Sequence, residues 1–509
     1  MSVKNKTASG RILHNSFWYG LETILETVVF LSSSIAVARY LGPHKLGYYS
    51  YIGFFVNTVT RTGGSGLASA TRKYMAEFLV QNKIGIARGI YHLAYRYQLL
   101  ASTLIAGVGI GGILLFGESG FKLMSCILIG SIIPSLMSMV PAQANQAFED
   151  VYSNTISAFG YLVTYAIFIV CTVRFHWDLV GVASAFLAAR VVELVMRTIP
   201  LHAKLRKMPL EPVGAEITSR IRNYCIQSVG IQLLMSVVWD RSEMIFLRAF
   251  STLEQMAFYS VSYTFATNLL LVPRTFGSAT GITLMVESSR DPSRVDSIVK
   301  NACRYLLFVA IPVHLGAAAI TREAIGVTYG PKYMLAVPVL IVAAILSLPR
   351  AFQEFSEVLM RAADRQKQLL IWLSITAIVN VCLDYLLIPR FGAVGAAWGN
   401  GLSQAFGIMA VWQVARRLYV FSFPIQSAIR FSLAGLLMSV VAFFISRSLG
   451  GWTGLILAII AATPTYLFFV RTFRAFDPSD RVRLAPIGNR LPAPIRRFYT
   501  ATIAFITPV

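Results

Sequence analysis

The sequence contains an unbroken apolar stretch, LLASTLIAGVGIGGILLF, which runs from Leu99 to Phe116. A helix needs roughly 20 predominantly apolar residues to cross the hydrocarbon core of a bilayer. Similar stretches follow one another from Asn15 to Val470, and they predict an all-α polytopic membrane protein of about fourteen transmembrane helices. The predicted spans are residues 14–38, 46–68, 88–116, 121–143, 153–173, 178–200, 223–247, 256–284, 300–321, 334–359, 368–388, 392–415, 426–446 and 452–471.

Composition and charge distribution support a membrane protein. Of the 509 residues, 56% are hydrophobic and 13% are charged, which is far more apolar than a soluble chain. The formal net charge of +22 would suggest nucleic acid binding in a soluble protein. With a cytoplasmic N-terminus, however, thirty of the 45 Lys and Arg residues fall on the cytoplasmic side, nine on the opposite side and six within spans. This positive-inside pattern predicts that both termini are cytoplasmic and that membrane lipids, not nucleic acid, attract the basic residues.

The two halves of the sequence resemble each other. RTGGS at Arg61–Ser65 corresponds to RTFGS at Arg274–Ser278, at an offset of 213 residues. Weaker matches occur in the same order along both halves and at nearly the same offset. One of them is Arg96-Tyr97 in the first half, which matches Arg304-Tyr305 in the second. Such duplication is typical of transporters, and an even number of helices per repeat places the pseudo-twofold axis along the membrane normal. We therefore predict two six-helix lobes and two C-terminal helices.

The predicted domain boundaries follow from the spans and the repeat. They are a cytoplasmic N-terminus at 1–13, an N-lobe at 14–200 (helices 1–6), a cytoplasmic linker at 201–222, a C-lobe at 223–416 (helices 7–12), helices 13–14 at 424–471 and a basic cytoplasmic tail at 472–509.

Two short motifs carry a family resemblance. ARYLGP at Ala38–Pro43 and LGYY at Leu46–Tyr49 resemble the first inter-helix turn of the polysaccharide-transporter family. That family includes the O-antigen flippases and is part of the multidrug/oligosaccharidyl-lipid/polysaccharide exporter superfamily. The second half has a degenerate counterpart from Asp240-Arg241 to Tyr259-Ser260, which lacks the glycine pair.

The resemblance implies a V-shaped transporter in a bacterial-type inner membrane. Such a protein would move an isoprenoid-diphosphate-linked oligosaccharide from the cytoplasmic to the outer leaflet during cell-surface polysaccharide biosynthesis. Enzymes of polysaccharide synthesis or polymerisation are the partners that it implies.

Arginines inside the predicted spans are the candidate substrate-binding residues. A charged group in the bilayer is costly, so it usually faces a bundle interior or a wet cavity. The repeat places Arg61 and Arg274 at equivalent depth in the two lobes, where their guanidinium groups could hold a diphosphate. Arg350 and Arg96 are further candidates, and the nearby Gly63, Gly64 and Gly277 would let a headgroup approach the backbone. The alternative is that each arginine pairs with an acid and locks two helices together.

Acidic residues inside the predicted spans are the candidates for coupling or gating. Asp240 and Glu243 are three residues apart, on one face of the predicted helix 223–247. A buried acid pair suits a protonation switch, although interhelical bonding is equally compatible with it. Glu22 and Glu26 share a face of the first helix and could take up protons or a cation, or meet an arginine of another helix.

Other intramembrane charges are spaced for pairing along one helix. Arg190 with Glu193, and Arg350 with Glu354, have the i,i+3 and i,i+4 spacings of local ion pairs.

Several function classes lack their sequence signatures. There is no GxxxxGK[ST] phosphate loop, and the six histidines form no metal-binding motif, so we expect no cofactor, no metal and no enzymatic activity. A multidrug or organic-cation antiporter of the same superfamily is the main alternative. A membrane-embedded glycosyltransferase or ligase fits less well, because no long outer loop is predicted. A non-transporting scaffold would require every intramembrane charge to be paired.

Overall fold

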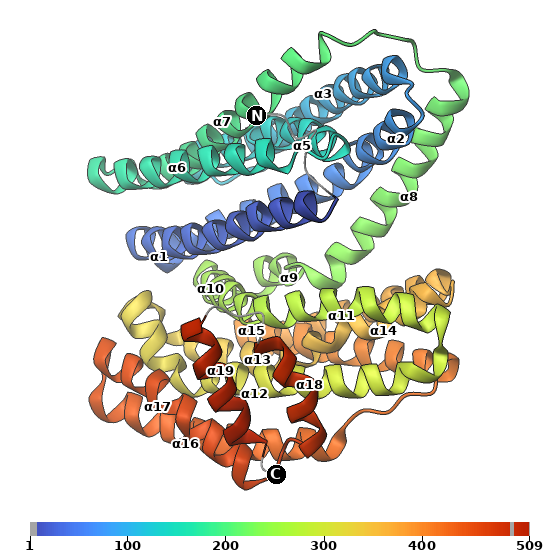
Figure 1. Ribbon diagram of the computed structural model, residues 1–509. Coiled ribbons are helices and arrows are strands. Elements are labelled where there is room, and N and C mark those ends of the chain that lie inside the picture. The colour runs from blue at the N-terminus through green and yellow to red at the C-terminus, as the bar shows by residue number, and fades with distance from the viewer. Residues whose placement is uncertain (1–7, 489–492, 508–509) are drawn as a thin grey trace. The chain divides into compact units, whose positions relative to one another are not determined.

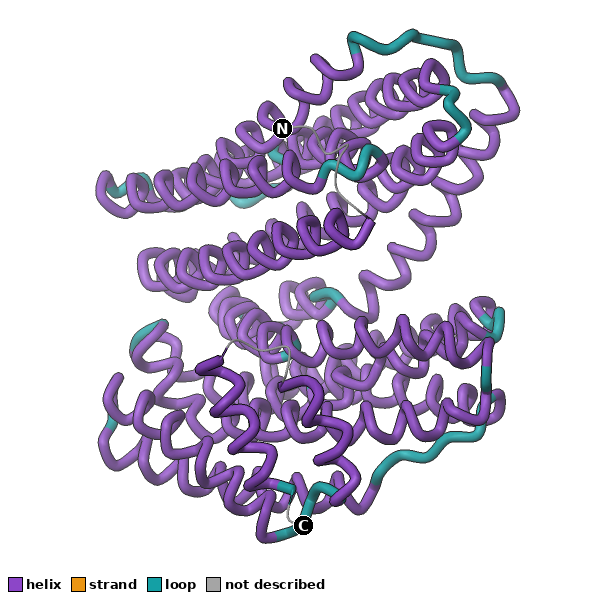
Figure 2. The backbone as a smooth tube through the Cα atoms, in the orientation of Figure 1, coloured by secondary structure: helices purple, strands orange, loops and turns teal. Residues whose placement is uncertain are grey.

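A computed structural model describes residues 8–488 and 493–507 of the chain (Figure 1). Every regular element within these residues is helical, and no strand occurs among them (Figure 2). The bilayer explains this choice, because a helix satisfies its own backbone hydrogen bonds where no water is available. The prediction of an all-α fold is therefore confirmed.

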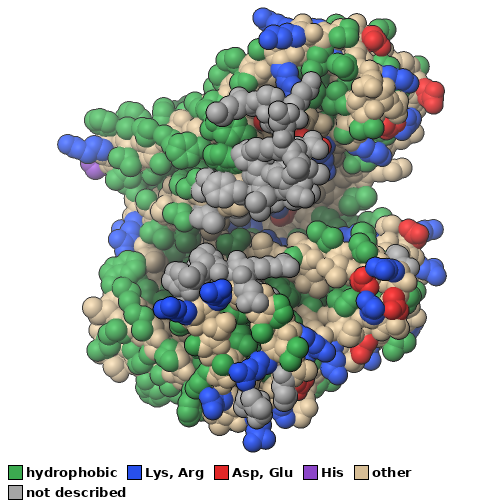
Figure 3. Space-filling model, viewed as in Figure 1, with side chains coloured by type: hydrophobic (Ala, Val, Ile, Leu, Met, Phe, Trp, Pro, Cys, Tyr) green, Lys and Arg blue, Asp and Glu red, His purple; other side chains and the backbone are tan. Residues whose placement is uncertain are grey.

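Many of the helices are long and apolar enough to cross a membrane. Among the described residues there are nine by length and composition, or ten if a pair of helices bent by 45° counts as one span. Hydrophobic side chains are exposed over wide areas of the face in Figure 3, as expected of a surface that meets lipid. The chain is thus a multi-pass membrane protein. The predicted total of fourteen crossings and the pseudo-twofold axis stay predictions.

Two of the helices each combine a pair of predicted spans. Helix α1 (Ala8–Gly63) covers 14–38 and most of 46–68, and its path changes at Gly42, where φ is 74°. Helix α15 (Gln366–Leu418) covers 368–388 and 392–415, with the corresponding break at Gly392, where φ is 54°. Only glycine adopts such positive φ angles without a steric penalty, so these two residues mark where one span ends and the next begins.

The contacts divide the chain into two compact units. The first runs to Arg248 and includes Thr252–Ala257, and the second contains Ala249–Ser251 and everything from Phe258 onward. Helices α9 (Glu243–Phe250) and α10 (Leu253–Leu269) contain the passage from one unit to the other.

In the first unit, helix α5 lies at the centre, in contact with α2, α3 and α7. Its Leu136 and Ala144 are fully buried, and so is Tyr91 of α3. Besides α1, α9 and the start of α10, the helices of this unit are the π-helix η2 (Gly64–Ala68), α2 (Ser69–Val80), α3 (Ile84–Phe116), the short 3-10 helix η3 (Ser119–Phe121), α4 (Lys122–Gly130), α5 (Ile132–Ala147), α6 (Val151–Phe175), α7 (Asp178–Leu205) and α8 (Ala215–Trp239).

Helix α8 packs with the first unit, although the predicted C-lobe begins at residue 223. Arg220 donates to both carboxylate oxygens of Glu77 at 3.2 Å, and the hydroxyl of Tyr74 donates to the carbonyl of Arg220. The boundary that the helix contacts define between the two units thus lies one helix later than the predicted linker 201–222. The functional division into lobes stays a prediction.

In the second unit, α16 and α17 pack against each other and against α12. A Cβ atom on Gly435 of α16 would lie only 2.6 Å from Ile311 of α12, so glycine permits this close packing. The helices of this unit are α11 (Leu271–Arg290), η4 (Pro292–Arg294), α12 (Val295–Thr328), η5 (Pro331–Ala336), α13 (Val337–Leu346), η6 (Leu348–Phe352), α14 (Gln353–Ala362), α15, α16 (Ile425–Leu449), α17 (Gly451–Thr472), α18 (Pro478–Gly488) and α19 (Ala493–Ile506).

The predicted basic tail 472–509 contains α18 and α19 and packs on the second unit (Figure 1). Asp480 of α18 is fully buried and lies 3.0 Å from the guanidinium of Arg304, which is itself only 5% exposed. The hydroxyl of Tyr305 also donates to Asp480, at 3.0 Å, and Asp477 contacts Arg304 as well. The tail therefore supplies the counter-charge of a buried arginine on α12.

Replacing Asp480 tests this contact. In D480A the guanidinium of Arg304 loses its buried partner, and removing one member of such a pair destabilises by about 3 kcal/mol. We expect a clear drop in the thermal unfolding temperature of the detergent-solubilised protein. S479A, which changes the adjacent exposed residue, is the control. Equal unfolding temperatures for D480A and S479A would show that the tail is not held by this ion pair.

Candidate functional site

Arg61 lies next to an irregular turn of its helix. It precedes the π-helix η2, whose i to i+5 hydrogen bonds interrupt the regular α-helical pattern. Cβ atoms on Gly63 and Gly64 would lie 2.7 Å from Leu136 and 2.1 Å from Met139 of α5. These glycines therefore allow helices to approach each other, and the expectation that they leave room for a headgroup is wrong.

Arg61 pairs with Asp240 within the first unit. Its Nη1 lies 2.6 Å from Oδ1 of Asp240, and the side chains are 63% and 18% exposed, respectively. The pair joins α1 to the end of α8, as the helix-locking alternative predicts. A guanidinium has five N–H donors, however, and the bond to Asp240 uses one of them. An arginine this exposed retains donors for an anionic ligand.

Asp240 and Glu243 do not share a continuous helix. Helix α8 ends at Trp239, Asp240 has extended backbone angles (φ −99°, ψ −163°), and α9 begins at the fully buried Glu243. The hydroxyl of Ser242 donates to the carbonyl of Val237 and satisfies an acceptor that the end of the helix exposes. The predicted helix over 223–247 is therefore interrupted, and Asp240 lies at the interruption.

Arg274 lies beside a break of its own, in the second unit. It is exposed on α11, four residues after Leu270, where α10 and α11 are bent by 45° relative to each other. A Cβ atom on Gly277 would lie 3.3 Å from Cβ of Glu354, so this glycine also serves helix packing. Arg61 and Arg274 belong to different units, and their predicted apposition across a shared cavity stays a prediction.

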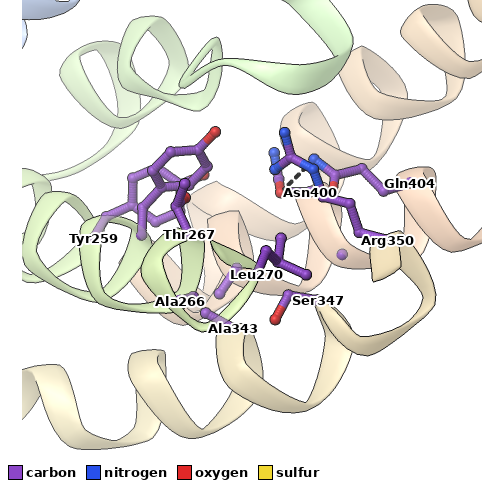
Figure 4. A pocket seen from close by; sticks show the side chains of 12 residues that line it. Tyr259, Ala266, Thr267, Leu270, Ala343, Ser347, Arg350, Asn400 and Gln404 are labelled. Atoms are coloured by element: carbon purple, nitrogen blue, oxygen red, sulfur yellow. Dashed lines mark hydrogen bonds between the residues drawn. The ribbon is translucent and has the colours of Figure 1, made fainter. Parts of the chain in front are cut away.

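Arg350 lines a small pocket inside the second unit. Arg350, Asn400 and Gln404 lie together on one side, and Tyr259 and Thr267 lie on the other (Figure 4). Helices α10, α13, η6 and α15 supply the walls, which also include Tyr263, Ala266, Leu270, Ala343, Ser347, Ala397 and Gly401.

The amides of this pocket are ordered by a hydrogen bond. Nε2 of Gln404 donates to Oδ1 of Asn400 at 3.0 Å. The cavity volume is about 30 Å³. A polar cavity of this size has room for ordered water.

The sequence contained a signal for this pocket that we did not use. Asn400 and Gln404 are four residues apart in an otherwise apolar stretch, and buried amides in a membrane helix usually bond across helices.

Other intramembrane charges form pairs. Glu193 accepts from Arg190 and Arg197 at 2.8 Å each, which confirms the predicted Arg190–Glu193 pair. Glu354 and Glu357 both pair with Arg361, at 3.3 and 3.2 Å. Arg350 itself is in the 3-10 helix η6, so its register relative to Glu354 is not that of an α-helix.

The remaining predicted site residues are not part of either arrangement. Arg96 is exposed on α3, beside the exposed Tyr97 and Leu100. Glu22 and Glu26 are in α1, but their side chains lie outside the described residues.

The residues of the first inter-helix turn have structural roles. A Cβ atom on Gly47 would lie 1.8 Å from the carbonyl oxygen of Leu253, so only glycine lets these backbones meet. His44 lies 2.8 Å from Glu254, and the hydroxyl of Tyr40 accepts from the N–H of Asp178 at 3.0 Å. The motif thus anchors the start of α10 and the start of α7 in the first unit.

Comparison with known proteins gives two sequence matches. Residues 121–338 match a family described as polysaccharide biosynthesis protein. The probable flippase AglR of Haloferax volcanii is 28% identical over 245 residues, which are 46% of this chain and 50% of that protein. The chain thus matches about half the length of this curated relative.

Solved structures share the fold over most of the chain. A lipid II flippase, MurJ, in an inward closed conformation superposes with a TM-score of 0.73 at 14% identity. The match covers 89% of this chain and 98% of the MurJ chain. An inward-facing multidrug resistance MATE family transporter of the MOP superfamily has a TM-score of 0.67 at 15% identity, with coverage of 77% and 94%. Identities this low establish the fold and not the substrate.

The close approach at Gly47 can be tested with a matched pair of variants. In G47A the new methyl group would overlap the Leu253 carbonyl, and overpacking of this kind costs about 1–3 kcal/mol. G53A is the control in the same helix, because a Cβ atom there would meet nothing within 4 Å. We expect a lower unfolding temperature in detergent for G47A alone. The packing role would be refuted if both variants unfolded at the wild-type temperature.

Proposed function

We propose that this chain is a polysaccharide flippase of the multidrug/oligosaccharidyl-lipid/polysaccharide exporter superfamily and that it moves an isoprenoid-diphosphate-linked oligosaccharide across the membrane by alternating access. The transfer runs from the cytoplasmic to the outer leaflet of a bacterial-type inner membrane, with both termini cytoplasmic. The observation that carries this proposal is the family match to residues 121–338. The exposed guanidinium groups of Arg61 and Arg274 support it.

Arg61 supplies the chemistry that a diphosphate requires. Its guanidinium is permanently charged and presents paired donors that match phosphate oxygens. A diphosphate that binds the remaining N–H donors of Arg61 competes with the carboxylate of Asp240 for the positive charge of the guanidinium. Binding then loosens the contact between α1 and the interruption after α8. In this way substrate binding is coupled to a structural change, with Asp240 and Glu243 as the gating acids.

Arg274 and Arg350 are the substrate-binding arginines of the second unit. Arg274 is exposed next to the bend between α10 and α11. Its guanidinium group would therefore move if the angle of that bend changed. Arg350 lines a small pocket together with Asn400 and Gln404, so its guanidinium lies beside further hydrogen-bonding groups that suit a phosphate oxygen or a water molecule. Glu22 and Glu26 remain candidates for proton or cation uptake.

A multidrug or organic-cation antiporter is the second candidate. The MATE family neighbour shares the fold, and Arg61 is paired with an acid, as a cation transporter would require. An exposed arginine repels an organic cation, however, whereas aromatic and acidic side chains attract one. Arg61 and Arg274 are both exposed, and this favours the anionic substrate.

A flipping assay in proteoliposomes tests the proposal. The probe is a fluorescent isoprenoid-diphosphate oligosaccharide, whose transfer is measured by protection from a membrane-impermeant quencher. We expect R61Q and R274Q each to slow transfer about 10- to 100-fold, because each removes charge-assisted hydrogen bonds to phosphate. R417Q, at the exposed end of α15, is the control.

Three results would contradict the proposal or a part of it. Wild-type transfer rates in folded R61Q and R274Q would exclude a role of these arginines in binding the substrate. Gradient-driven uptake of an organic dye such as ethidium, without transfer of the lipid probe, would establish the antiporter instead. Undiminished transfer in D240N would remove Asp240 from the gating mechanism.

A further inference from the structure

Helices α3 and α7 meet in an aromatic and histidine contact in the first unit. The hydroxyl of Tyr91 lies 3.3 Å from Nε2 of His202, and the rings of His92 and His202 are stacked with centroids 6.3 Å apart. Tyr95 packs edge-on against His202, at 5.7 Å. The contact lies toward the start of α3 and the end of α7, so it is near one surface of the membrane. The distribution of Lys and Arg predicts that this surface is the cytoplasmic one.

Three arginines surround this contact. Arg88, His92 and Arg96 are spaced four residues apart on one face of α3, and Arg206 follows His202 by one turn. Nε of Arg88 lies 3.4 Å from His92. We call these five residues the α3–α7 seam.

The seam has little negative charge of its own. In the part of the chain that the structure describes, no carboxylate forms an ion pair with its three arginines. Glu193 of α7 is already shared by Arg190 and Arg197. The carboxylate of Glu211 lies against Gly85, three residues before Arg88, and offsets part of the positive charge. Among the described residues, Arg88 donates to the carbonyl oxygen of Met208, and Glu211 is an acid placed beside the start of α3.

An apolar surface continues directly from the seam. Tyr97, Leu99 and Leu100 are exposed next to Arg96, and Val195 and Ile199 are exposed on α7, one to two turns before His202. Both helices are long and apolar enough to cross the membrane, and exposed apolar side chains on such helices are suited to contact acyl chains. A cationic group at the edge of such a surface is stable only if it reaches the interface or an anion.

We propose that the α3–α7 seam binds the phosphate headgroup of an anionic membrane phospholipid. The arginines donate to the phosphate oxygens, the Tyr and His rings lie at headgroup level, and the acyl chains cover the exposed apolar residues of both helices. Free phosphate would use only the first of these contacts. Because apolar surface and cations are adjacent, the occupant is a lipid and not a soluble anion. Arg96 therefore binds a lipid of the surrounding bilayer and not the transported substrate.

Retention of lipid by the intact purified protein tests this site. The protein is reconstituted in vesicles of equal parts phosphatidylglycerol and phosphatidylcholine, extracted in mild detergent and examined by native mass spectrometry. We compare the wild type with R88Q/R96Q/R206Q and with a control of equal charge change, R174Q/R416Q/R417Q, whose three arginines are exposed elsewhere. Size-exclusion profile and unfolding temperature verify that each variant is folded.

We expect the wild type and the control to retain phosphatidylglycerol in preference to phosphatidylcholine. In the seam variant, the ratio of retained phosphatidylglycerol to phosphatidylcholine should fall about fivefold for each arginine removed, because one arginine near a membrane surface contributes about that factor. Addition of inorganic phosphate at millimolar concentration should leave the bound lipid in place.

Three outcomes would overturn the site. One is equal retention in the seam variant and the control, and another is displacement of the lipid by inorganic phosphate. The third is unchanged lipid retention in R96Q together with loss of flipping, which would return Arg96 to the substrate path. Because the lipid assay needs no transport, its result is independent of the proposed function.

Discussion

The bilayer provides no hydrogen-bond partner for a peptide group, and this constraint governs the structure. It requires helices throughout the membrane-crossing residues and makes every interruption costly. The interruptions that occur are correspondingly specific. Glycines supply the positive φ angles at residues 42 and 392, and Ser242 satisfies a carbonyl that the end of α8 leaves exposed. The candidate residues Arg61, Asp240 and Arg274 all lie at or beside an irregular turn, where the chain has already lost regular helical geometry.

The sequence predicted the helices well, because hydrophobicity over about 20 residues depends only on local composition. It also predicted the Arg190–Glu193 pair, whose partners lie on one helix. It did not predict the Arg61–Asp240 pair, since 179 residues separate the partners and many acids were possible. The glycine pair at 63 and 64 was misinterpreted for a similar reason: space for a ligand and space for a neighbouring helix have the same sequence signal.

The candidate site could be predicted only in part. Arg61 and Arg274 were predicted as the principal pair and Arg350 and Arg96 as further candidates, and the structure gives these arginines different surroundings. Arg61 is exposed and paired, Arg350 lines a pocket with two amides, and Arg96 borders apolar surface. These differences arise from tertiary contacts, and residue type and spacing alone do not distinguish them. The amides at 400 and 404 were overlooked because charge, and not hydrogen-bonding capacity, guided the selection.

The buried contact between Arg304 and Asp480 has a consequence for biosynthesis. Arg304 is on α12, and its fully buried partner is synthesised 176 residues later, on α18. While the ribosome is still translating the intervening helices, this guanidinium must stay solvated or find a temporary partner. The second unit therefore reaches its final packing only after α18 has emerged from the ribosome. A stalled nascent chain would present an incompletely assembled bundle to the quality-control proteases of the membrane.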